Sequence, residues 1–264
     1  MFDVWFEDAD KKKTHVWQTS WGLSTRSIGS MIMVHSDNTG MVLPPRVAQT
    51  QVVIVPIFYK NDDSKAMLDK AFEIRDQLVA AGVRAKVDDS DTHNPGFKFN
   101  QWEVRGVPVR MELGKKDFDN AEVRVAVRHD GRKFQMKQDG IAASTCELLD
   151  KIHSEMFEKA KNARDTHIKE VDNWKDFMEA LDGRNLCLAP WCDVKKCEVK
   201  IKDQSKEESL QKMAEANEDE TLLTGAAKTL CIPYELGNQK LAEGVKCFYC
   251  GEQAKVTALW GRSY

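Results

Sequence analysis

The segment QVVIVPI, residues 51–57, is a continuous apolar run of strand length. Such a run suits an interior strand of a largely parallel sheet, which is buried on both faces. A helical pattern follows it: Ser64 can cap the helix, apolar residues recur as far as Leu78, and Gly82 stands where a C-terminal glycine belongs. VRAKVDD, 83–89, is a second strand, and this order predicts a βαβ unit.

A short helix and an alternating strand come next. Asn94 marks the start of the helix and Gly106 its end. In PVRMELG, 108–114, successive side chains point to opposite faces of a strand. Arg110 and Glu112 therefore share one face, and the other face carries the apolar residues Val109, Met111 and Leu113.

The rest of the chain continues the α/β pattern. Two strand-like runs, 121–129 and 133–138, flank Asp130-Gly131, a strong hairpin signal. Residues 142–163 read as a long helix, which completes an α/β domain with a mixed sheet. Beyond it the pattern predicts a short helix, an apolar strand and a charged helix at 173–183, 186–191 and 206–216.

Residues 1–47 read as strand and loop segments with nothing before them to pair with. Residues 1–8 alternate loosely, 16–29 carry two tryptophans and two glycines, and 30–48 contain a double proline. We expect these strands to complete a sheet that lies mostly upstream, so that the chain is a fragment of a longer protein.

Composition and charge exclude several classes of protein. The 264 residues, 42% of them hydrophobic, suffice for two domains. The N-terminus lacks the pattern of a secretory signal, and no run approaches the roughly 18 apolar residues of a membrane helix, so we expect a soluble, cytoplasmic protein without a membrane partner. With a net charge of −3, any RNA contact must use a local basic surface. One stretch offers such a surface, although a solvated face is the alternative: Lys115, Lys116, Arg124, Arg128, Arg132, Lys133 and Lys137.

Four of the seven cysteines form two close pairs, Cys192 with Cys197 and Cys247 with Cys250. Without an export signal, thiols or metal ligands are favoured over disulfides. Two such pairs fit tetrahedral Zn²⁺, and four protein ligands favour a structural zinc over a catalytic one. Ordinary buried thiols are the alternative, and a redox role has little support. The unpaired cysteines are predicted to be buried small hydrophobes: Cys146, Cys187 and Cys231.

Two other constellations could bind nucleotides. The loop 21–29 combines glycines, hydroxyls and Arg26, although a glycine-bounded turn with a surface arginine would look the same. Phe99 and Glu103 are four residues apart on one helical face, and the following strand supplies Arg110. This set could stack on a single-stranded guanine and bond to its edge. The alternative is an aromatic core contact with a helix–strand salt bridge.

Four segments together resemble prolyl-tRNA synthetases of the eukaryotic and archaeal type: SWGLSTRSIG (20–29), MVHSDNTGMVLPPRVA (33–48), PGFKFNQWEVRGVPVRMELG (95–114) and GRSY (261–264). They occur in the order of that family, and the resemblance covers essentially the whole chain.

The resemblance implies three α/β parts. Residues 1–47 would end a class II catalytic domain built on an antiparallel sheet, 48–164 would form a mixed-sheet anticodon-binding domain, and 165–264 would form a small zinc-binding domain.

The resemblance also implies roles for particular residues. Ser24 and Arg26 match positions that contact ATP. A second set would border the proline pocket: Ser20, Trp21 and Gly22. A third matches positions that read the two guanines of proline anticodons: Phe99, Glu103, Arg110 and Lys116. The zinc ligands would be Cys192, Cys197, Cys247 and Cys250.

The family activates L-proline with ATP and Mg²⁺ and ligates it to tRNA(Pro). The first two class II motifs are not in this sequence, so we assign no catalytic residue and expect the polypeptide alone to be inactive. The family is dimeric, largely through the catalytic domain. The alternative function is a free-standing, non-catalytic RNA-binding module with an anticodon-binding fold, which would give residues 1–47 a self-contained surface.

Overall fold

The computed structural model describes residues 3–58, 63–215, 225–237 and 241–262, so the last two residues of the GRSY motif lie outside it. The chain forms two compact units, Met1–Phe157 and Glu158–Tyr264. The division between them falls inside α5, Ile141–Thr166.

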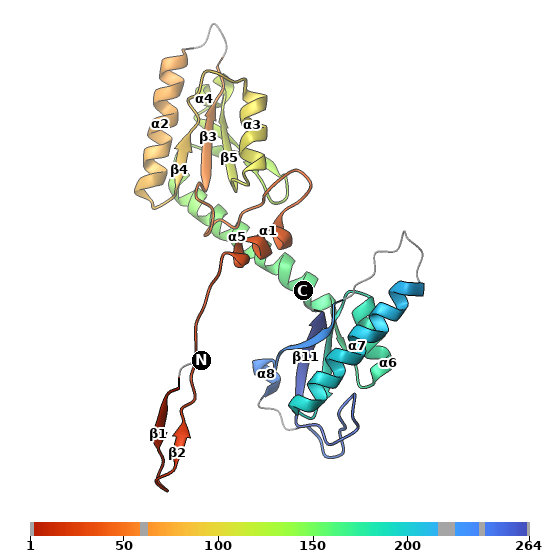
Figure 1. Ribbon diagram of the computed structural model, residues 1–264. Helices are drawn as coiled ribbons and strands as arrows, with labels where there is room; N and C mark the ends of the chain where they lie inside the picture. The colour runs from red at the N-terminus through yellow and green to blue at the C-terminus, as the bar shows by residue number, and fades with distance from the viewer. Residues whose placement is uncertain (1–2, 59–62, 216–224, 238–240, 263–264) are drawn as a thin grey trace. The chain divides into compact units, whose positions relative to one another are not determined.

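The first unit is built on a five-stranded sheet with the order β4-β3-β5-β6-β7 (Figure 1). β3 lies parallel to β4 and β5, whereas β5, β6 and β7 are antiparallel neighbours. The apolar run at 52–56 is thus a central, fully buried strand, and the predicted mixed sheet is confirmed. The strands are β3 Val52–Pro56, β4 Ala85–Val87, β5 Val109–Leu113, β6 Glu122–Val127 and β7 Lys133–Lys137.

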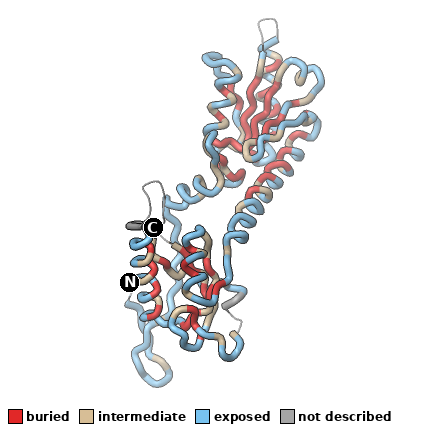
Figure 2. The backbone as a smooth tube through the Cα atoms, turned by 90° about the vertical axis from the view of Figure 1, so that its right-hand side faces the viewer, coloured by how far each residue is buried: buried red, intermediate tan, exposed pale blue. Residues whose placement is uncertain are grey.

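Helices cover the two faces of this sheet unequally. α2, Ser64–Ala80, and α5 pack on one face over a large core of aliphatic side chains. Figure 2 marks the buried positions along the backbone in red. α3, Pro95–Val104, packs on the opposite face, where Trp102 and Phe99 contact the strand residues Val53 and Val55. Beyond α3, Arg124 of β6 and Lys133 and Lys137 of β7 are exposed, whereas Ala126 of β6 is buried.

Helix boundaries follow the predicted signals closely. The side chain of Asn94 accepts a hydrogen bond from the Phe97 amide and caps α3, as predicted. α2 is capped by Asp63, whose carboxylate accepts from the Ala66 amide, so the prediction of Ser64 as its cap is wrong by one residue. The short helix α4, Lys115–Asp119, was not predicted.

The N-terminal segment holds an antiparallel pair, β1 Trp5–Glu7 and β2 Lys13–His15, and a helix, α1 Arg26–His35. The expectation of strand and loop is therefore wrong for 26–35. The spacing of Ile28, Met31 and Ile32 is helical, and the extended reading overlooked it.

Residues 36–48 are attached to the end of α3. The Met41 amide donates to the Val104 carbonyl at 3.0 Å, and the Leu43 amide donates to the Gly106 carbonyl at 3.3 Å. Gly106 has φ +72°, and an added Cβ would lie 2.8 Å from Met41, so only glycine lets the two segments approach this closely.

The second unit has a four-stranded sheet with the order β10-β11-β9-β8. The helix at 173–183 and the strand at 186–191 are confirmed, and the charged stretch at 206–215 is the end of a longer helix. Phe177 and Trp260 meet edge to face in its core. The elements are β8 Ile168–Glu170, α6 Trp174–Asp182, β9 Leu186–Trp191, α7 Lys195–Glu215, β10 Ala227–Cys231, α8 Tyr234–Gly237 and β11 Val256–Arg262.

Among the described residues, no helix has both the length and the apolar character needed to cross a membrane.

Candidate functional site

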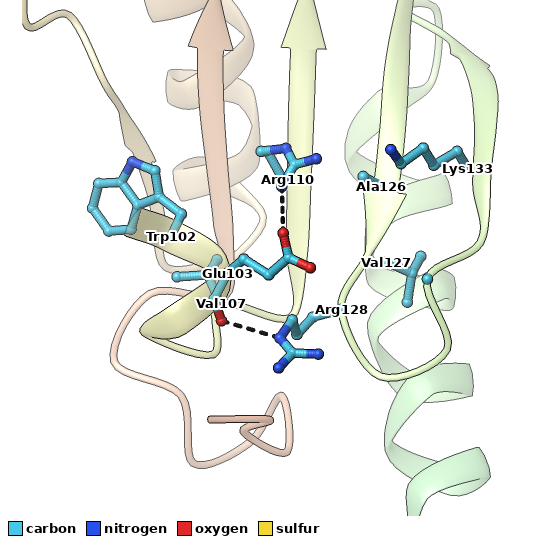
Figure 3. Close-up of a pocket in the computed structure, with 9 residues that line it drawn as sticks. Trp102, Glu103, Val107, Arg110, Ala126, Val127, Arg128 and Lys133 are labelled. Carbon is cyan, nitrogen blue, oxygen red and sulfur yellow. Dashed lines mark hydrogen bonds and ion pairs between the residues drawn. The ribbon is translucent and has the colours of Figure 1, made fainter. Parts of the chain in front are cut away.

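A cavity of about 220 Å³ lies in the first unit beside α3 and over β5 and β6. Glu103 and Trp102 of α3, Arg110 of β5, and Arg128 and Lys133 are among the residues that line it. Figure 3 shows the carboxylate of Glu103 turned toward Arg110, with Lys133 on the far side of the opening.

The guanidinium of Arg110 is held on one edge. Its Nε and Nη2 donate to Oε1 of Glu112 at 3.1 and 3.0 Å, and its plane lies over the Phe99 ring at 4.3 Å. Nη1 is held less closely, 3.5 Å from the Phe99 carbonyl and 4.0 Å from Glu103 Oε2. The guanidinium of Arg110 is thus oriented by the buried carboxylate of Glu112 and by the Phe99 ring, while its Nη1 atom faces Glu103.

A second arginine, Arg128, holds the C-terminal end of α3 in place. Arg128 Nε donates to the Glu103 carbonyl at 3.0 Å, and both of its Nη atoms donate to the Asp37 carboxylate at 2.8 and 2.7 Å. The hydrogen bond from Arg128 holds the pKa of the Asp37 carboxyl well below its usual range. This clamp joins residues 91 positions apart in the sequence and ties the 36–48 segment to α3.

The body of α3 is anchored by Asp88 at the end of β4. The Trp102 indole Nε1 donates to Asp88 Oδ2 at 2.7 Å, and Lys98 Nζ lies 3.6 Å from Oδ1 of the same carboxylate. All three residues are buried, so the helix has little freedom to rotate over the sheet.

The structure brings three of the four predicted base-reading residues together: Phe99, Glu103 and Arg110. Lys116 lies exposed on α4 and is not among the residues that line the cavity. The alternative interpretation is also realised in part, because Phe99 packs on the core beneath α3 and Glu103 approaches Arg110. Glu112 and Asp88 were missed as site residues, although strand alternation had already placed Glu112 beside Arg110.

The four predicted zinc ligands converge in the second unit. Cys192 follows β9, Cys197 lies in the first turn of α7, and Cys247 and Cys250 lie in the loop before β11. Their sulfur atoms all lie within 4.8 Å of one another, with Cys197–Cys247 at 3.9 Å and Cys192–Cys250 at 3.7 Å. Tetrahedral thiolates at about 2.3 Å from Zn²⁺ would be about 3.8 Å apart, so the donor set fits the ion.

Burial makes several thiols hard to ionise unaided. It raises the pKa of Cys192 to about 11 and also raises that of Cys197. Burial acts in the same direction on Cys247, but backbone amides that point at its sulfur outweigh burial and lower its pKa. A bound cation would favour the deprotonated form of these crowded thiols, because a metal binds cysteine as the thiolate.

The other cysteines differ from one another. Cys187 is buried, and burial raises the pKa of its thiol to about 12. Cys146 is half-buried, and Cys231 is exposed near the end of β10. The prediction that all three are buried is therefore wrong for Cys231, since residues near the end of an edge strand are open to solvent.

The predicted ATP-contacting and proline-pocket residues precede α1 or lie at its start. Ser24 and Arg26 are exposed, as are Ser20, Trp21 and Gly22, with Trp21 97% exposed. Trp17 and Leu23 are also almost fully exposed, so this segment presents apolar side chains to solvent and is not a self-contained surface.

Comparison with known families matches both units. The model for an anticodon binding domain matches residues 51–144, and the model for the C-terminal part of prolyl-tRNA synthetase matches residues 174–264.

Comparison with individual proteins gives the same result. The cytoplasmic proline-tRNA ligase of Arabidopsis thaliana is 40% identical over 264 residues, covering 100% of this chain and 47% of the relative. The proline-tRNA ligase of Encephalitozoon cuniculi is 41% identical, covering 100% and 52%. A crystal structure of prolyl-tRNA synthetase from Cryptosporidium parvum, complexed with L-proline and AMP, matches with a TM-score of 0.84 and 38% identity, covering 98% and 50%. The chain spans about half the length of these relatives.

Proposed function

Because the chain belongs to the prolyl-tRNA synthetase family and matches its C-terminal portion, we propose that it reads the anticodon of proline tRNA for a proline-tRNA ligase. The whole enzyme would activate L-proline with ATP and Mg²⁺ and transfer it to the tRNA. The relatives match residues 1–47 as well as the anticodon-binding unit, which favours this function over a free-standing RNA-binding module.

One observation carries the anticodon proposal: the guanidinium of Arg110, bonded to Glu112 and 4.3 Å from the centre of the Phe99 ring, lies 4.0 Å from Glu103 where both line an open cavity. In this arrangement a guanine would stack near Phe99, accept hydrogen bonds from Arg110 at O6 or N7, and donate its N1–H and N2–H to Glu103. Lys116 would approach the RNA from α4.

Binding of the 264-residue chain to proline tRNA tests the proposal. The comparison is the same tRNA with both anticodon guanines replaced, at one fixed salt concentration. One well-made contact to a guanine discriminates by about 1 to 3 kcal/mol, so the native tRNA should bind roughly 5- to 150-fold more tightly. Equal affinity for the two tRNAs would reject the proposal.

We also propose that Cys192, Cys197, Cys247 and Cys250 hold a structural Zn²⁺. When bound, the ion would link the end of β9, the start of α7 and the loop before β11. The four sulfur donors would leave no coordination position for a substrate, which supports a role in folding.

Residues 20–26 would complete the catalytic half of the enzyme. Ser24 and Arg26 would contact ATP, and Ser20, Trp21 and Gly22 would border the proline pocket. The exposure of this segment supports the proposal, since a surface that completes a larger site is open when that site is absent. The cytoplasmic relative from Arabidopsis thaliana supports a cytoplasmic location here.

A further inference from the structure

The seven cations of the 115–137 stretch fall into two groups in the structure. Three are held by carboxylates: Lys115 by Asp119, Arg128 by Asp37, and Arg132 by Glu155 and Asp130. Within the described part of the chain, the remaining four side chains have neither an ionic nor a hydrogen-bonding partner: Lys116, Arg124, Lys133 and Lys137.

Strand register places three of these unpaired cations on one open face. Val123, Val125 and Val127 of β6 point into the core beneath α2 and α5, so Arg124 points to the opposite face. Lys133 pairs with Ala126 in register and Lys137 pairs with Glu122, which puts both lysines on the same face as Arg124.

The carboxylates on and beside this face have other partners or lie near its edge. Glu112 lies opposite Arg124 in register but is bonded to Arg110. Glu122 is the acidic neighbour of Lys137. Asp117 accepts from the side chain of Gln135, which lies on this face, and from the Gly114 amide. Arg124 and Lys133 are therefore cations of this face that no carboxylate among the described residues pairs with.

This cationic face borders the guanine-reading cavity. Lys133 lines the same cavity as Arg110 and Glu103 (Figure 3). In the sheet, β7 is two strands from β5, about 10 Å away. A nucleotide placed against Phe99 and Arg110 would bring its flanking phosphates toward β6 and β7.

We propose that Arg124 and Lys133, with Lys137 beside them, bind the phosphate backbone of the anticodon loop. This inference rests on the proposed function, because it takes the ligand of the neighbouring cavity to be RNA. Phosphate contacts position the RNA and add affinity, and they carry no information about base identity.

The test compares two double variants of the full chain. Arg124→Gln/Lys133→Gln removes two cations of the face. Lys65→Gln/Lys151→Gln is the matched control, because it removes two exposed cations from α2 and α5, on the other side of the sheet. Binding to proline tRNA and to the guanine-replaced tRNA is measured over a series of salt concentrations at constant Mg²⁺.

Arg124→Gln/Lys133→Gln should weaken binding of both tRNAs by the same factor. Its slope of log affinity against log salt should be shallower by about 1.4 to 1.8, because each lost phosphate contact removes about 0.7 to 0.9. The control should keep the wild-type slope.

The outcomes separate this inference from the proposed function. An unchanged slope, or an altered preference between the two tRNAs, would overturn the backbone role even if wild type prefers the native anticodon. If wild type binds both tRNAs equally, anticodon reading fails, and the slope difference still decides the backbone role. No binding of wild type to either tRNA would overturn both.

Discussion

Individual side chains that line the cavity work in pairs that restrict one another. Glu112 holds the Nε edge of Arg110 and Phe99 lies against its guanidinium, so under the proposed function Arg110 would lose little entropy on binding a base. Arg128 uses all three of its nitrogens on Asp37 and on the backbone at Gly40 and Glu103, so it serves as a structural clamp with no edge left for RNA.

Replacing Arg110 tests its role as a reader. Arg110→Ala should reduce the preference for the native anticodon by about 1 to 3 kcal/mol, measured as the ratio of affinities for the two tRNAs. Since the single change leaves Glu112 buried without its partner, Arg110→Ala/Glu112→Ala serves as the control for stability. An equal loss for both tRNAs would show that Arg110 contacts only the backbone.

The Asp37–Arg128 clamp should respond to acid. Because the folded pKa of Asp37 is lowered from 3.8, its contribution to stability is present above that pH and is lost as the pH falls further. Asp37→Asn should cost about 1 kcal/mol of unfolding free energy near neutral pH, a modest value because the carboxylate is 48% exposed. Denaturant unfolding of wild type and variant should show this difference shrinking as the pH drops below about 4; a constant difference would contradict the assignment.

At the scale of elements, two contacts between segments shape the sites. The end of α3 lies against the 36–48 segment through glycine backbone, and the loop before β11 lies against β9 and α7 through four sulfur atoms. Both contacts join segments that are distant in sequence. The hydrogen bonds within helices and strands do not form either of them.

Substitutions at two glycines can distinguish the cost of steric crowding from the cost of backbone strain. Gly106 and Gly131 have φ of +72° and +74°, but an added Cβ meets Met41 at 2.8 Å at Gly106 and nothing within 4 Å at Gly131. Gly131→Ala should cost about 1 kcal/mol, and Gly106→Ala about 1 to 3 kcal/mol more. Thermal unfolding of both variants measures the difference, and equal costs would mean that the 36–48 segment moves aside.

The cysteine cluster predicts a metal-dependent second unit. Cys250→Ser should abolish bound zinc and strongly destabilise residues 158–264, because a structural zinc contributes on the order of 10 kcal/mol to small sites. Cys231→Ser, at an exposed cysteine outside the cluster, is the control. Elemental analysis and thermal unfolding provide the readouts. Unchanged zinc content in Cys250→Ser would reject the ligand set.

Across the whole molecule, the proposed anticodon reading and amino-acid activation would draw on different parts of the chain. The cavity, its anchoring residues and the cationic face all lie within residues 37–137. The residues assigned to ATP and proline lie within 20–26 and are exposed.

Tested alone, the 264-residue polypeptide should therefore bind proline tRNA without activating proline. Proline-dependent exchange of pyrophosphate into ATP should not rise above the level without proline, because the proposed ATP contacts of Ser24 and Arg26 would be only a few of the groups needed to stabilise the phosphates. Anticodon-dependent tRNA binding by the same preparation is the control for folding. Exchange above background would show that these residues form a competent site.

Local sequence patterns were enough to predict the parts of this protein that depend on near neighbours in the chain. The apolar run at 52–56, the cap at Asn94, the hairpin at Asp130-Gly131 and the shared face of Arg110 and Glu112 follow from local periodicity and turn chemistry. The paired spacing of the cysteines likewise predicted their convergence. The helix α1 was missed because its short apolar pattern could be read in more than one way.

Which charged groups are paired and which are available depends on the packing of distant segments and could not be predicted from the sequence. Arg132 and Lys133 are adjacent in the sequence, yet Arg132 forms an ion pair with Glu155 of α5, whereas Lys133 lines the cavity. Asp37 finds Arg128 across 91 positions. Such partners are set by strand order and by the packing of segments far apart in the chain, and local pattern carries no information about them.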